Sequence, residues 1–223
     1  MNILGLQGGD NSYNRSFYKL IFRYIKDGDN LLNLGCGINF NFEKTLADAR
    51  KVRIVSGDIF VPLAKPDFID EYIDKSVEEP FSLDMKFDVV TFFELIEHID
   101  KTDELLKNCF NNLKDEGYFI FSCPNLASIY ARFELLLGYQ PHILEVSNEY
   151  PNFGTGIFGR LNNKNNEPLH HIRGITYRAM VAMLKFHGFK VIKVIGYEYR
   201  LKKLFYYFPG IAPINIYICK KDI

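Results

Sequence analysis

Short apolar runs alternate with helix-like stripes along most of the chain, and this alternation predicts the order of its secondary structure. Apolar runs rich in β-branched and aromatic residues predict strands at 31–34, 52–56, 87–92, 118–123, 190–195 and 214–219, with a weaker one near 71–74. Apolar residues at helical spacing predict helices at 17–25, between the first two strands to about Arg50, at 105–113 and between Thr176 and Gly188. Strands that alternate with helices predict an α/β fold with a doubly wound, mostly parallel sheet.

The length of the chain fits one domain with an elaboration. We therefore expect a single domain over residues 1–223 that opens with an N-terminal cap helix within residues 1–28. Residues 138–172 break the strand–helix rhythm and are rich in Gly, Pro and Asn. Because a long irregular segment in a compact domain is usually functional, we expect residues 138–172 to form an inserted acceptor loop or lid.

Composition and charge exclude several classes of protein. The 20 Phe and 14 Tyr residues supply a large core, which excludes a disordered chain. Lys+Arg and Asp+Glu both number 27, so no net basicity favours a nucleic-acid partner. The start of the chain has no basic region of a signal peptide, and no apolar run reaches the roughly 18 residues of a membrane span. No pair among the four cysteines has metal-knuckle or redox spacing, so we expect a soluble, cytoplasmic protein with free thiols.

A basic, aromatic stretch at residues 200–208 has two interpretations. It could be a core helix with solvated lysines, which we favour, or a weak contact with a membrane or a lipid-linked substrate. The oligomeric state does not follow from the sequence.

A glycine turn follows the first predicted strand, where a doubly wound sheet usually anchors a nucleotide-like cofactor. Gly35-Cys36-Gly37 forms this turn, although a Gly-x-Gly alone is equally common as a structural turn. An NAD fingerprint would place a third glycine at position 40, where the chain has Phe40. Asp58 ends the second strand, where a carboxylate accepts hydrogen bonds from ribose hydroxyls. The two features together favour a ribose role for Asp58 over a surface turn.

Acidic residues and a histidine follow the strand predicted at 87–92. Glu94, Glu97 and His98 lie beside the expected cofactor mouth, where carboxylates favour a cationic ligand. Taken alone, acids at the start of a helix are explained as well by the helix dipole.

These motifs together resemble the class I S-adenosylmethionine-dependent methyltransferases. The resemblance rests on Leu32-Asn-Leu-Gly-Cys-Gly37, Gly57-Asp58-Ile59, Phe87-Asp-Val-Val90, Glu94-Leu-Ile-Glu-His98 and Ser122-Cys-Pro-Asn125, and it covers roughly residues 30–125 and 170–220. The subgroup that looks most similar is that of the ubiquinone/menaquinone-type and small-molecule enzymes. The resemblance implies a Rossmann-like seven-stranded sheet whose last strand is antiparallel, and S-adenosyl-L-methionine as cofactor.

The resemblance also implies roles for single residues. Gly35, Cys36 and Gly37 would lie under the methionine part of the cofactor, with Glu94 near the same moiety. Asp58, with Ile59 in the same motif, would bind the ribose, and Asp74 would contact the adenine. The family usually has Asp at the position of Asn33 and often a small residue at that of Asn39. Because both changes could weaken cofactor affinity, a non-catalytic S-adenosylmethionine-binding regulatory or scaffold subunit is the alternative to an enzyme.

Methyl transfer from a sulfonium needs alignment of acceptor and methyl group, and a base only where the acceptor loses a proton. His98 is the candidate base, or else a packing histidine. His170, His171 and Arg173 could face the acceptor, with Arg173 suited to a carboxylate or phosphate, although we favour a hydrogen-bond cluster for them. His171, Arg173 and Tyr13 are the candidate substrate-binding residues. His98 with His171 and a carboxylate could hold a divalent metal, but no ligand spacing supports one, so none is expected. The aromatic and amide-rich loop favours a small polar acceptor, and we expect O-methylation of a sugar or glycan precursor.

Overall fold

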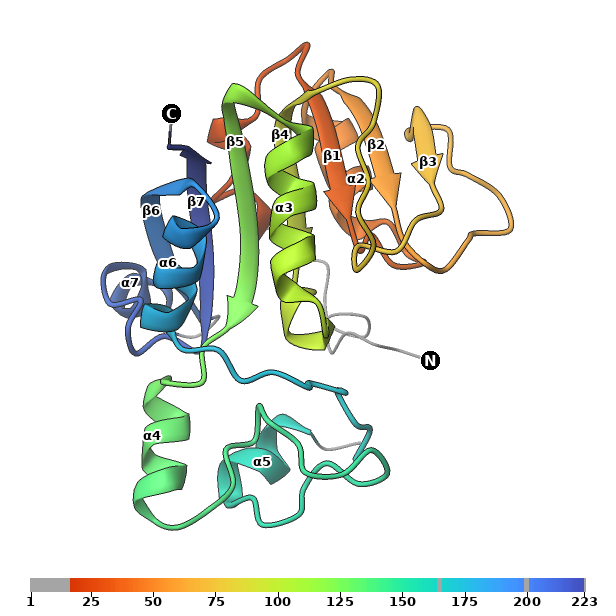
Figure 1. Ribbon diagram of the computed structural model, residues 1–223. Helices are drawn as coiled ribbons and strands as arrows, with labels where there is room; N and C mark the ends of the chain where they lie inside the picture. The colour runs from red at the N-terminus through yellow and green to blue at the C-terminus, as the bar shows by residue number, and fades with distance from the viewer. Residues whose placement is uncertain (1–16, 164–165, 199–200, 223) are drawn as a thin grey trace.

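The computed structural model describes residues 17–163, 166–198 and 201–222, and these residues form one sheet covered by helices (Figure 1). The sheet has seven strands in the order β3-β2-β1-β4-β5-β7-β6. Their bounds are β1 Asn30–Leu34, β2 Arg53–Gly57, β3 Glu71–Ile73, β4 Phe87–Phe93, β5 Leu113–Pro124, β6 Phe189–Tyr197 and β7 Ile214–Lys221. All seven predicted strands are therefore present.

Strand direction confirms the predicted fold class. The pairs β3–β2, β2–β1, β1–β4 and β4–β5 are parallel, and β7 runs antiparallel to both β5 and β6. The main difference is that β5 begins at Leu113 rather than near Tyr118, because the helix before it passes directly into the strand.

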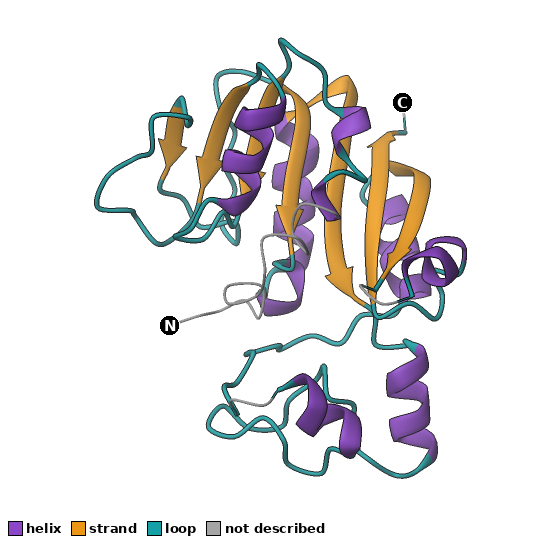
Figure 2. Cartoon of the chain, turned by 180° about the vertical axis from the view of Figure 1, so that it is seen from behind, coloured by secondary structure: helices purple, strands orange, loops and turns teal. Residues whose placement is uncertain are grey.

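Helices cover both faces of the sheet, as Figures 1 and 2 show from opposite sides. The helix bounds are α2 Asn41–Ala49, α3 Thr102–Asn112, α4 Ile129–Leu136, α5 Ile157–Asn162, α6 Tyr177–Phe186 and α7 Lys202–Tyr207, with 3-10 helices η1 Phe22–Tyr24 and η2 Ile96–His98. On one face α3 and α6 pack against the sheet through Leu105, Leu106, Met180 and Leu184. On the other face the sheet is covered by α2 and by the segment before β1. The predicted cap of α6 is present, because the Thr176 hydroxyl accepts a hydrogen bond from the amide of Ala179 at 3.2 Å.

The segment before β1 corrects one prediction. Residues 17–25 do not form one continuous amphipathic helix: a short helical turn is followed by η1, and Ile25 is extended. Six of these nine residues are aromatic or β-branched, and such side chains lose freedom in a helix. Their apolar side chains nevertheless pack onto the sheet, with Phe17 edge-on to Phe93. Residues 1–16, which include Tyr13 and most of the expected cap helix, lie outside the described residues.

Residues 125–176 leave the sheet after β5 and return to α6. This insertion contains α4 and α5 and lies beyond the carboxyl ends of the central strands (Figure 1). It thus occupies the edge of the sheet at which ligands of doubly wound folds bind.

The basic, aromatic stretch forms the short helix α7. Phe205 is buried and packs beside β6, whereas Leu204 and Tyr207 are exposed. Tyr206 also packs against the core, whereas Lys203 is exposed. The helix thus has an apolar contact with the core and a solvated lysine, and membrane contact stays a prediction. Among the described residues, no helix is both long and apolar enough to cross a bilayer.

A buried polar cluster lies under the turn that follows β1. The Asn33 amide donates to Glu43 Oε1 at 2.6 Å, and the Ser56 hydroxyl donates to the same oxygen at 2.9 Å. Thr91 Oγ1 donates in turn to Asn33 Oδ1 at 2.8 Å. Burial raises the pKa of the Glu43 carboxyl above its ordinary value. Asn33 therefore joins β1 to α2 through its hydrogen bond to Glu43, which belongs to α2.

Glu43 should make the protein less stable as pH rises. Because the folded state holds the Glu43 proton more tightly than the unfolded chain, its contribution is fully present below the ordinary carboxyl pKa and is lost as pH rises through the raised value. We expect the melting temperature of Glu43→Gln, relative to that of the wild type, to be roughly 2–4 °C higher at pH 8 than at pH 5. A loss of about 1 kcal/mol in the wild type gives a shift of this size in a domain of this length. Thermal unfolding across this pH range measures it. A constant difference would show that Glu43 does not titrate there.

Candidate functional site

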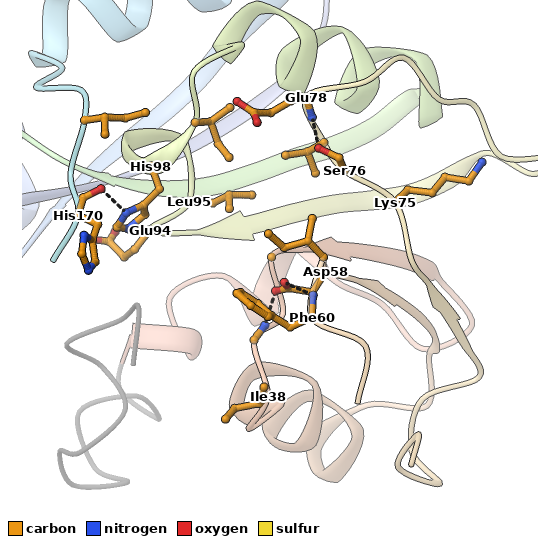
Figure 3. Close-up of a pocket in the computed structure, with 16 residues that line it drawn as sticks. Ile38, Asp58, Phe60, Lys75, Ser76, Glu78, Glu94, Leu95, His98 and His170 are labelled. Atoms are coloured by element: carbon orange, nitrogen blue, oxygen red, sulfur yellow. Dashed lines mark hydrogen bonds between the residues drawn. The ribbon is translucent and has the colours of Figure 1, made fainter. Parts of the chain in front are cut away.

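A cavity of about 480 Å³ opens at the carboxyl ends of β1, β2 and β4 (Figure 3). Its wall includes the glycine turn, the loops after β2 and β3, the segment after β4 and the end of the insertion. The lining residues are Gly35, Gly37, Ile38, Asp58, Ile59, Phe60, Lys75, Ser76, Val77, Glu78, Glu94, Leu95, His98, Ile99, His170 and Ile172.

The glycine turn forms the floor of this cavity beside β1. Gly35 and Gly37 have φ values of 69° and 62°, a backbone conformation that side chains rarely adopt. A Cβ atom on Gly35 would lie 2.9 Å from the Leu95 side chain. The amide of Gly35 donates to the Gly57 carbonyl at 2.8 Å, which ties the turn to the end of β2. The turn therefore exposes backbone to a ligand without a side chain in between.

Asp58 fixes the turn and borders the cavity. Its Oδ2 accepts a hydrogen bond from the Gly37 amide at 2.9 Å, and its Oδ1 accepts one from the Phe60 amide at 3.1 Å. Each carboxylate oxygen can accept a second hydrogen bond. Ile59 is 62% exposed and lines the same wall.

Glu94 lies across the cavity from Asp58, at the end of β4 (Figure 3). Its φ of 49° is strained for a residue with a side chain, and such strain concentrates at functional sites. The Ser122 hydroxyl donates to Glu94 Oε1 at 2.6 Å. Burial raises the pKa of Glu94 to about 7, which the Ser122 hydrogen bond opposes.

Glu97, His98 and His171 form a cluster behind this wall. Glu97 Oε1 lies 3.9 Å from the Nε2 atoms of both histidines, and the two rings are 4.8 Å apart between centroids. Burial, with the Glu94 charge, raises the pKa of Glu97. Burial, with the neighbouring His171, lowers the pKa of His98 to about 4, and burial also lowers that of His171. Both imidazoles are therefore neutral at physiological pH.

The structure brings together seven of the predicted site residues. Gly35, Gly37, Asp58, Ile59, Glu94 and His98 line the cavity, and His171 contacts the cluster behind it. Cys36 packs into the core, Asp74 is not among the lining residues, and Tyr13 lies outside the described residues. Arg173 donates from Nε to the Ile99 carbonyl at 2.9 Å and from Nη2 to the Asp100 carbonyl. This is the hydrogen-bond cluster that we favoured from the sequence.

Several lining residues were not predicted as site residues. Lys75–Glu78 follows β3 where Asp74 was expected, because this loop does not align with the family pattern. His170, which the sequence suggested could face the acceptor, and Ile172, which it did not indicate, close the cavity from the end of the insertion. The other unpredicted lining residues are apolar neighbours of predicted ones: Ile38, Phe60, Leu95 and Ile99. Among the described residues of 138–172, the lining ones are His170 and Ile172.

The comparisons with known proteins agree with this architecture. The sequence profile of a family described as a methyltransferase domain matches residues 7–194. A SAM-dependent methyltransferase from Archaeoglobus fulgidus is 17% identical with a TM-score of 0.61, over 96% of this chain and 95% of that one. An S-adenosylmethionine-dependent methyltransferase from Clostridium acetobutylicum is 13% identical with a TM-score of 0.61, over 98% and 94%. The [4+2]-cyclase SpnF is 10% identical with a TM-score of 0.60, over 97% and 86%. No curated protein matches the sequence.

Proposed function

Because the chain belongs to the family of S-adenosylmethionine-dependent methyltransferase domains, we propose that it transfers the methyl group to a hydroxyl of a small polar metabolite, such as a sugar or a glycan precursor. The activity class and the cofactor follow from the family. The acceptor is the proposal, and the observation that carries it is the polar end of the cavity at Glu94, His98 and His170.

The residues at the opposite end fit the cofactor. Gly37 and Asp58 offer the exposed backbone and the carboxylate lone pairs that a nucleoside with an amino-acid arm requires, beside the apolar Ile59. When bound, S-adenosylmethionine supplies an electrophilic methyl on a sulfonium. The Glu94 carboxylate favours that positive charge by Coulomb attraction.

The polar end suits a hydroxylated acceptor better than an apolar one. Histidine and carboxylate side chains can hydrogen-bond several hydroxyl groups, and a long apolar tail would leave them unpaired. We assign the acceptor contact to His170, which lines the cavity, rather than to Arg173, which donates to the Ile99 carbonyl. A role for His98 as base remains a prediction, and its low pKa makes it a weak base.

Asp58→Ala should weaken S-adenosylmethionine binding by about 10- to 150-fold. A hydrogen bond from a ligand to a charged group contributes about 1.5–3 kcal/mol, and the same change frees the Gly37 amide. Isothermal titration calorimetry measures the effect, and Asp70→Ala is a matched control because that carboxylate accepts from the Ile54 amide outside the cavity. A loss below about tenfold for Asp58→Ala would favour a surface turn over the ribose role.

The acceptor class is tested with S-adenosylmethionine that carries a labelled methyl group. The protein is incubated with fractionated cell extract, and label is counted in small polar metabolites, lipids, protein and nucleic acid. We expect S-adenosylhomocysteine to form and the label to enter small metabolites as an ether. Label in nucleic acid or protein would contradict the proposed acceptor, and binding without S-adenosylhomocysteine in any fraction would favour the non-catalytic subunit.

A further inference from the structure

The cluster behind the polar wall contains three buried polar atoms without a hydrogen-bond partner among the described residues. The Glu97 side chain is 1% exposed, and neither of its carboxylate oxygens has a hydrogen-bond partner among the described residues. The Nε2 atom of His98 likewise has none. Buried polar atoms are normally paired, so three orphaned atoms in one cluster require an explanation.

The hydrogen bonds of the two histidines fix which ring nitrogen carries the proton. His98 Nδ1 lies 3.1 Å from the His170 carbonyl, and His171 Nδ1 lies 2.7 Å from the Ile143 carbonyl. Because a carbonyl oxygen only accepts, both Nδ1 atoms donate. Both Nε2 atoms therefore present a lone pair toward Glu97 Oε1, at 3.9 Å.

A carboxylate and two imidazole lone pairs that face one another in a buried site repel unless a proton or a cation neutralises them, and at 3.9 Å a proton on Glu97 would make no hydrogen bond to either ring. We propose that Glu97, His98 and His171 bind a divalent first-row transition-metal ion such as Mn²⁺, Fe²⁺ or Zn²⁺. Imidazole nitrogens suit these ions, and two histidines with one carboxylate leave coordination positions open. This proposal departs from the sequence expectation of no metal.

The ligand atoms lie close enough for side-chain rotation to bring them around one ion. The ligand atoms of the three residues all lie within 4.8 Å of one another, and Glu97 Oε1 is 3.9 Å from the Nε2 atom of each histidine. Two atoms that are each about 2.1 Å from one ion lie about 3.0–3.4 Å apart at octahedral or tetrahedral angles. Each 3.9 Å separation must therefore close by at least about half an ångström, and a separation at the 4.8 Å limit by about 1.4 Å, which rotations of the three side chains supply.

The surrounding structure holds the ligands in place. Metal-bound histidines typically donate their other ring N–H to a carbonyl, and both histidines here do so. The Glu97 carbonyl accepts the amides of Ile172 and Arg173, each at 3.0 Å, which joins η2 to the end of the insertion. The Arg173 guanidinium adds hydrogen bonds between the same two segments. Arg173 is thus a positioning residue for the cluster.

The role of the ion rests on the proposed function. His98 lines the cavity and its buried Nε2 lies on the side of Glu97, so an ion on this atom would lie directly behind the polar end where the acceptor is proposed to bind. An acceptor hydroxyl held next to the ion would lose its proton more readily to the Glu94 carboxylate, which lines the same cavity, because the positive charge stabilises the oxyanion. A ligand role replaces the base role predicted for His98, since a lone pair shared with a cation cannot also accept a proton.

Metal binding is tested on the full chain without turnover. Chelator-treated protein is titrated with Co²⁺, which is followed by visible absorption, and the bound metal is counted after desalting. We expect one ion per chain, displaced by Zn²⁺ more readily than by Mg²⁺, which prefers oxygen ligands. Absence of stoichiometric binding would overturn the proposal.

Variants separate this site from adventitious binding. Glu97→Gln and His171→Gln should each weaken Co²⁺ binding at least tenfold, whereas His187→Gln should not, because His187 pairs with Asp103 outside the cluster. Equal binding by all three variants would place the ion elsewhere and overturn the proposal. Titration of the same variants with S-adenosylmethionine shows whether they are folded. If the wild type does not bind S-adenosylmethionine, the proposed function is overturned, whereas the metal result still stands.

Discussion

Gly37→Val should reduce S-adenosylmethionine binding on the order of 100-fold or more, without unfolding the protein. The φ of 62° at Gly37 is strained for a β-branched residue at about 1–3 kcal/mol. The Gly37 amide also donates to Asp58 at 2.9 Å, so a turn that moves to relieve the strain takes the ribose carboxylate with it. Calorimetric titration gives the affinity, and circular dichroism reports the fold.

Gly28→Val is the matched control for this change. Gly28 also has a positive φ, 89°, and its Cβ would meet nothing within 4 Å. Gly28→Val therefore carries a comparable backbone strain away from the cavity, and it should lose stability but retain cofactor affinity. Equal affinity of Gly37→Val and Gly28→Val would show that the glycine turn does not hold the cofactor.

Asn33→Asp should destabilise the protein by about 3 kcal/mol. The side-chain amide of Asn33 donates a hydrogen bond to Glu43 Oε1 at 2.6 Å. A carboxyl group at position 33 would therefore place two acids together in a buried site and remove the hydrogen-bond donor between them. Urea unfolding at neutral pH gives the free energy. An unchanged free energy of unfolding would show that this cluster does not depend on a neutral partner for Glu43.

The double variant that combines Asn33→Asp with Glu43→Gln keeps one carboxyl group and exchanges its position. The amide introduced at position 43 would donate to the carboxylate introduced at position 33, and we expect stability to return to within about 1 kcal/mol of the wild type. Such rescue would explain why this chain has Asn where related enzymes usually have Asp.

The sequence predicted the sheet and the cofactor end of the cavity because their signals are local. Apolar runs located all seven strands. Gly37 and Asp58 follow the first and second strands closely in the sequence, and their positions there indicate a turn and a ribose carboxylate. The partner of Asn33 could not be predicted, because Glu43 lies on the following helix and no local pattern joins them.

The acceptor end was predicted less well because it depends on contacts between distant segments. Glu97 and His171 are 74 positions apart and meet only because the insertion returns along η2. Arg173 was a candidate for holding an anion, with a hydrogen-bond cluster as the favoured interpretation, and the fold directs it to backbone carbonyls. Aromatic residues of the insertion were expected to form the acceptor site, but among its described residues those that reach the cavity wall are His170 and Ile172.

The electron density of a crystal grown with S-adenosylhomocysteine tests the central claim most directly. The account predicts one molecule in the cavity, with its ribose hydroxyls on Asp58 and its amino-acid arm against the turn at Gly35–Gly37. Its sulfur should point toward the wall that Glu94 and His98 form. Density for the ligand at any other place, or an empty cavity at saturating ligand, would contradict the assignment of this site.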